Sequence, residues 1–118
     1  MATKFREVLE RLVRNADLEG AILTTVDGLP VEAVLPAGMS EERLSAMSAA
    51  ILSLGERAVF ELEKGNLEQI TVKSEKGYVI VTGIGEEAVL TIMAGADAKL
   101  GLLYLEIRKA AEELAKLL

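Results

Sequence analysis

The sequence contains no cysteine, no histidine and no tryptophan. Without cysteine there is no disulfide, no thiolate nucleophile and no cysteine-based zinc site. Without histidine the chain lacks the commonest metal ligand and the most frequent general base of enzymes. Aromatic residues are few, so aliphatic side chains must build the core; the four are Phe5, Phe60, Tyr78 and Tyr104. These absences argue against an autonomous enzyme, and we expect neither a metal nor a cofactor.

Positive charge and long apolar runs are also scarce. Thirteen Lys and Arg stand against nineteen Asp and Glu, a formal net charge of −6, which argues against binding to a phosphate backbone. The longest uncharged run, 44–55, is much shorter than the roughly 20 residues of a membrane-spanning helix. The first seven residues contain no apolar signal segment. We therefore expect a cytoplasmic protein with no nucleic-acid partner and no direct membrane insertion.

What is present suits one globular domain over residues 1–118, since hydrophobic residues make up 51% of the chain. Periodicity predicts helices over 4–16, 40–64 and 98–117 and strands over 20–26, 29–35, 67–74, 78–84 and 88–94. Short turns or single helices join all five strands. This order predicts an α+β fold with a mostly antiparallel five-stranded sheet and helices packed on it.

Local sequence signals refine this fold prediction. Asp27-Gly28 between two β-branched runs predicts a hairpin with a type I′ turn. Pro30 lacks an N–H group, so its strand belongs at a sheet edge. The strands over 78–84 and 88–94 are apolar on both faces and should be central. Gly65 is expected to end the long helix, and Asp97 to cap the last one.

The long helix has two apolar sides. At 100° per residue one stripe is broad enough to cover a sheet and comprises Leu44, Met47, Ile51, Leu54, Ala58 and Leu62. The opposite side, where a surface helix carries charge, instead holds Ala46, Ala49, Ala50, Ser53 and Phe60. A single sheet can cover only one of these sides. We therefore predict that the second side meets its symmetry mate in a homodimer.

Motifs for chemistry are weak. The segment 95–101 has glycines and a lysine but no Gly-Lys-Ser/Thr ending, so it is no phosphate-binding loop. Adjacent carboxylate pairs occur at Glu41/Glu42, Glu86/Glu87 and Glu112/Glu113, and because adjacent residues on a helix point about 100° apart, such pairs suit solvated charge rather than a shared proton or metal. Residues 17–42 contain six acidic residues and no Lys or Arg, a charge that either steers a basic partner or keeps a dimer in solution.

Three stretches together resemble the roadblock domain family, which includes roadblock-type dynein light chains and prokaryotic regulators of Ras-like GTPases of the gliding-motility type. They are the hairpin segment 20–31, the small-residue helix segment 46–57, and the segment 100–108 with its Gly-Leu-Leu opening. The resemblance spans nearly the whole chain and implies a roadblock/profilin-like fold. It also implies a homodimer in which the second helices pack together and the third strands pair across the two copies.

Mapped onto this sequence, the resemblance implies an interface at Ala46, Ala49, Ala50, Ser53 and Phe60 of the helix and at Gln69, Thr71 and Lys73 of the strand. It further implies a regulator or scaffold that binds a Ras-like small GTPase and modulates its GTP hydrolysis, as a GTPase-activating protein does. Such family members reposition the GTPase's own catalytic residues, so no catalytic residue is assigned. Arg43 and Arg57 are interpreted as interface or solubility charges rather than as arginine fingers.

Two alternatives stay open. The chain could be a structural assembly subunit, such as a motor or complex light chain, without effect on nucleotide turnover. It could also be a small-ligand sensory domain, which needs convergent polar groups in an apolar cavity. The predicted core offers few such groups, chiefly Thr24, Thr82 and Thr91.

Overall fold

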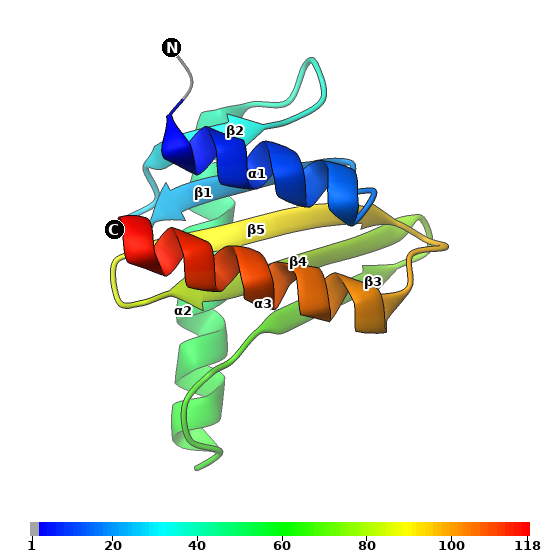
Figure 1. Cartoon of the computed structure of the whole chain (residues 1–118). Coiled ribbons are helices and arrows are strands. Elements are labelled where there is room, and N and C mark those ends of the chain that lie inside the picture. Colours follow the sequence, from blue (N-terminus) through cyan, green and yellow to red (C-terminus); the bar gives the residue numbers. More distant parts are fainter. Residues whose placement is uncertain (1–2) are drawn as a thin grey trace.

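The computed structural model describes residues 3–118, and its elements follow in the predicted order (Figure 1). They are α1 (Lys4–Asn15), β1 (Gly20–Thr25), β2 (Pro30–Val34), α2 (Glu41–Glu61), β3 (Ile70–Ser74), β4 (Gly77–Ile84), β5 (Ala88–Gly95) and α3 (Leu100–Leu117). The five strands form one sheet in the order β2-β1-β5-β4-β3, and every pairing is antiparallel. This confirms the α+β prediction.

The sheet lies between two unequal helical layers. Figure 1 shows α1 and α3 side by side on one face and α2 alone on the other. β4 and β5 are interior strands and β2 is an edge strand, as predicted from their apolar faces and from Pro30. The second edge of the sheet is β3, whose residues 71–74 are all exposed.

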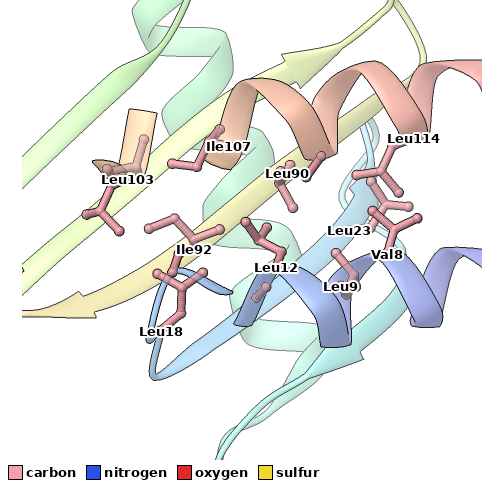
Figure 2. Packing of buried hydrophobic residues seen from close by; sticks show 14 of the residues in the cluster. Val8, Leu9, Leu12, Leu18, Leu23, Leu90, Ile92, Leu103, Ile107 and Leu114 are labelled. Carbon is pink, nitrogen blue, oxygen red and sulfur yellow. The ribbon is translucent and has the colours of Figure 1, made fainter. Parts of the chain in front are cut away.

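The larger core lies under α1 and α3 and is aliphatic, as the shortage of aromatics predicts. Figure 2 shows Leu9 and Leu12 of α1 and Ile107 of α3 pointing toward Leu90 and Ile92 of β5. Each of these side chains is buried. At about 1.5–3 kcal/mol per buried aliphatic side chain, this layer contributes most of the apolar stabilisation.

The layer under α2 is thinner and partly polar. Ser45 and Ser48 are buried against the sheet beside Leu52. The Ser48 hydroxyl accepts a hydrogen bond from Thr91 Oγ1 at 2.7 Å, and Ser45 Oγ donates to the Glu41 carbonyl at 2.7 Å. Because both hydroxyls have partners, these serines can face the sheet at little cost.

This orientation corrects the predicted inward stripe of the long helix. Of its six members only Leu44 and Ile51 are half-buried, while Met47, Leu54, Ala58 and Leu62 are exposed. The prediction assumed that large aliphatic side chains must point inward. Instead, small side chains point inward and let the helix approach the sheet closely.

Two glycines mark that close approach. A Cβ at Gly55 would overlap the Ile70 side chain, so the helix lies directly against the start of β3 there. A Cβ at Gly28, in the β1–β2 turn, would lie 3.4 Å from the Ala46 Cα. The α2 helix is therefore held between the hairpin turn on one side and β3 on the other.

The turn itself differs from the predicted type I′. Gly28 has a φ of +92°, but Asp27 is not among the residues with positive φ. The Gly28 N–H donates to the Thr25 carbonyl, and the Thr25 N–H donates to the Leu29 carbonyl. This is a three-residue hairpin with glycine at the left-handed position, and it needs only one positive φ.

Several element ends also differ from prediction. α2 ends at Glu61 rather than Lys64, because Glu63 takes the left-handed conformation (φ 55°) and the Lys64 N–H bonds the Val59 carbonyl at 2.8 Å. β3 begins at Ile70, since Leu67 packs beside α2 instead of extending the strand. The N-cap of α3 is Lys99, not Asp97, and has no side-chain capping bond.

The Ser48–Thr91 bond provides a test of this helix orientation. Ser48→Ala removes the acceptor of a buried hydroxyl, and we expect the free energy of unfolding to fall by about 1–3 kcal/mol. The double variant Ser48→Ala/Thr91→Val removes both polar groups and should recover most of that loss. Urea unfolding of the unaltered protein, the two single variants and the double variant measures the coupling; additive losses would contradict a direct bond between the two side chains.

Candidate interaction surface

The outward face of α2 carries two apolar stripes. At 100° per residue Met47, Leu54 and Ala58 fall within about 40° of one another, and so do Ala46, Ser53 and Phe60. All six are exposed, and the large ones strongly so, with 56% for Met47, 69% for Leu54 and 81% for Phe60. A helix that only covered a sheet would carry charge at these positions.

A narrow line of residues, polar only at Arg43 and Arg57, separates the stripes. Arg43, Ala50 and Arg57 recur every seven residues between them, and all three are exposed. Arg57 Nε lies 2.9 Å from Glu61 Oε1 in a helical ion pair open to solvent. The line is only one side chain wide, so one partner helix could cover it together with either stripe.

The two stripes face different parts of the domain. Gly55 and Ile51, on the same flank as Met47 and Leu54, pack toward Ile70 at the start of β3. Ala46 and Ala49, on the other flank, lie against Gly28 of the hairpin turn. We call the stripe of Met47, Leu54 and Ala58 the strand-side stripe, and that of Ala46, Ser53 and Phe60 the hairpin-side stripe.

The strand-side stripe lies next to β3, which forms one edge of the sheet. In the described part of the chain, no side chain forms a hydrogen bond with the backbone of residues 70–73. Val72 is exposed on the face that α2 covers, since it lies opposite Val79. An edge with free backbone groups and an apolar neighbour can accept another strand.

The predicted interface residues lie on α2, on β3 and just before β3. Ala46, Ala50, Ser53 and Phe60 are exposed on α2, whereas Ala49 is half-buried against the hairpin turn. Thr71 and Lys73 are exposed on β3, on the face toward α3, where Thr71 Oγ1 lies 3.1 Å from the Tyr104 hydroxyl. Gln69 precedes β3.

Sequence reasoning missed Met47 and Leu54, which it placed inside. Their seven-residue spacing repeats that of Ala46 and Ser53 and was visible in the sequence. The missing information was that serines would face the sheet.

The pockets formed by residues 3–118 are poorly suited to a small ligand. A shallow groove of about 380 Å³ lies between α3 and the segment before β3, and is lined by Glu68, Gln69, Thr82, Tyr104, Ile107, Arg108 and Ala111. The three core threonines bond within the protein, to the Thr25 carbonyl, the Glu68 carbonyl and Ser48 Oγ. No buried side-chain polar atom of the described residues lacks a partner.

Comparison with known proteins identifies the family. The sequence model of the Roadblock/LC7 domain matches residues 4–94. An uncharacterized protein of Methanocaldococcus jannaschii is 30% identical over 107 residues, which cover 91% of this chain and 93% of the relative. The chain belongs to the Roadblock/LC7 domain family, whose members are regulatory or adaptor domains rather than known catalysts.

Solved structures share the fold. MglB of Myxococcus xanthus superimposes with a TM-score of 0.92 at 22% identity, covering 98% of this chain and 94% of that one. The gliding protein MglB of Thermus thermophilus gives 0.85 at 20% identity, covering 98% and 92%. MglC of Myxococcus xanthus gives 0.69 at 20% identity, covering 98% and 100%. No helix in residues 3–118 is long and apolar enough to cross a membrane.

Proposed function

We propose that this chain is a homodimeric regulator or scaffold that binds a Ras-like small GTPase. The observation that carries the proposal is the outward face of α2, which exposes Met47, Leu54 and Phe60 beside an open sheet edge. Exposed apolar surface of this kind in a domain of its size marks a protein-binding site. Family membership supports the regulatory role.

The dimer forms through β3 and α2. An edge strand that pairs with its own copy about a two-fold axis joins two sheets into one and closes the assembly. The α2 helices then lie on the same face of the joined sheet, next to the shared edge. The resemblance to roadblock domains implies the same arrangement.

The position of β3 favours the strand-side stripe as the helix contact. The mate lies across β3, and Met47 and Leu54 are on the flank of α2 nearest that strand. The residues predicted from the family resemblance lie mostly on the hairpin side, with Ala50 between the two flanks. We propose that Met47, Ala50 and Leu54 meet the mate, and that Ala46, Ser53 and Phe60 are left for the GTPase.

Two substitutions at neighbouring positions separate these roles. Leu54→Glu places a charge on the strand-side stripe, and we expect the dimer to dissociate with the fold intact because the side chain is 69% exposed. Ser53→Arg, on the hairpin side, should leave the dimer intact and weaken GTPase binding. Sedimentation velocity and circular dichroism measure mass and fold.

The reverse result, a monomer with Ser53→Arg and a dimer with Leu54→Glu, would assign the mate to the hairpin-side set instead. Ala49→Glu is unsuitable for this test, because Ala49 lies against Gly28 and a charge there would disturb the hairpin.

The GTPase assignment is tested with the purified chain and the Ras-like GTPase encoded in the same genome, loaded with a GTP analogue or with GDP. We expect tighter binding to the GTP-bound form and faster GTP hydrolysis. Arg43→Ala and Arg57→Ala should each lower stimulated hydrolysis by less than about tenfold, since loss of an arginine finger costs about 10³–10⁵. An intact dimer that binds neither form would instead indicate a structural assembly subunit.

A further inference from the structure

At Ala33 the β2 edge of the sheet is covered by side chains, unlike the β3 edge. Ala33 lies opposite Ile22 of β1, but side chains satisfy both of its backbone polar groups. Arg6 Nη1 donates to the Ala33 carbonyl at 2.9 Å, and Glu32 Oε1 accepts from the Ala33 N–H at 3.3 Å. Since these bonds come from the side away from β1, they occupy the positions at which an added strand would pair.

The same two side chains bond to each other and to the start of α1. Arg6 Nη1 lies 3.1 Å from Glu32 Oε1, with the side chains 42% and 19% exposed. The second carboxylate oxygen of Glu32 accepts from Thr3 Oγ1 at 3.0 Å, and Thr3 in turn caps α1 by accepting from the Arg6 N–H. The first turn of α1 is thus fastened along the outer edge of β2. Pro30, at the beginning of that strand, has no N–H to offer.

The asymmetry of the two edges has a consequence for assembly. A dimer joined at β3 would carry a β2 strand at each outer end of its sheet. If those strands could pair, each dimer would add another at both ends, and the contact would generate an open-ended assembly.

We propose that the Arg6–Glu32 pair closes the β2 edge against the β2 strand of another copy, so that growth of the sheet ends at one mate. This proposal rests on the proposed function, because closing the β2 edge limits assembly to a dimer only if the dimer joined at β3 forms. The closed edge itself depends only on the contacts of Arg6, Glu32 and Ala33. The pair excludes a second copy of this chain. The β2 strand of that copy is identical to this one, so the two β2 strands would pair antiparallel in matching register.

The test removes the pair without changing net charge. We expect Arg6→Ala/Glu32→Ala to sediment as tetramers and larger species whose proportion rises with concentration, where the unaltered protein keeps one mass. Adding Ala33→Pro should restore that mass. The Ala33 N–H points away from β1, so proline removes the donor that an added strand would use but leaves the hydrogen bonds between β2 and β1 in place.

Arg11→Ala/Glu113→Ala is the matched control. This Arg–Glu pair joins α1 to α3 at 2.8 Å, is 45% and 42% exposed, and touches no strand edge. The control should keep the mass of the unaltered protein. The proposal is overturned if the Arg6/Glu32 variant keeps that mass too, if the control grows equally, or if Ala33→Pro does not reverse the growth.

If the double variant does not fold, Arg6→Met replaces it, because methionine keeps much of the apolar side-chain volume but donates no hydrogen bond to Glu32 or to the Ala33 carbonyl. It should show the same growth to a smaller extent, and an unchanged mass would overturn the proposal. The mass of the unaltered protein separates the two proposals: a monomer that becomes a dimer when the edge is opened would contradict pairing at β3 but support closure at β2.

Discussion

The close packing of α2 against the sheet is the constraint that determines which side chains the helix exposes to solvent. Ser45 and Ser48 face the strands, the Thr91 hydroxyl bonds Ser48, and Gly55 admits the Ile70 side chain. Because small residues take most of the inward positions beside Leu52, the larger side chains of Met47, Leu54 and Leu62 point to solvent. The packing of one side of α2 thus determines the chemistry of the other.

Much of the fold followed from local patterns. Asp27-Gly28 located the hairpin, Pro30 indicated an edge strand, and the doubly apolar runs marked β4 and β5 as interior. These signals act over a few residues and concern backbone geometry or strand burial, which sequence reports directly. The turn type was wrong because a three-residue loop also uses Asp-Gly but needs a positive φ only at Gly28.

The orientation of α2 could not be read in the same way. Its aliphatic residues are spread around the helix, so hydrophobicity alone does not select a face. The inward side instead carries small residues, one of which bonds to a strand more than forty residues away in the sequence. The Ser48–Thr91 contact is of this kind. The role of Arg6 was equally hidden, since a surface arginine on an amphipathic helix has no local signal for the strand edge beside it.

The seven-residue spacing of Met47 and Leu54 has a geometric consequence for any helix that packs there. On a straight helix of 3.6 residues per turn, such a stripe drifts by about 20° with each repeat. Two copies of α2 that remain in contact along it must cross at a small left-handed angle of about 20° rather than run side by side. Their ends then diverge from the crossing point, so the contact between the helices is confined to the middle of the stripe.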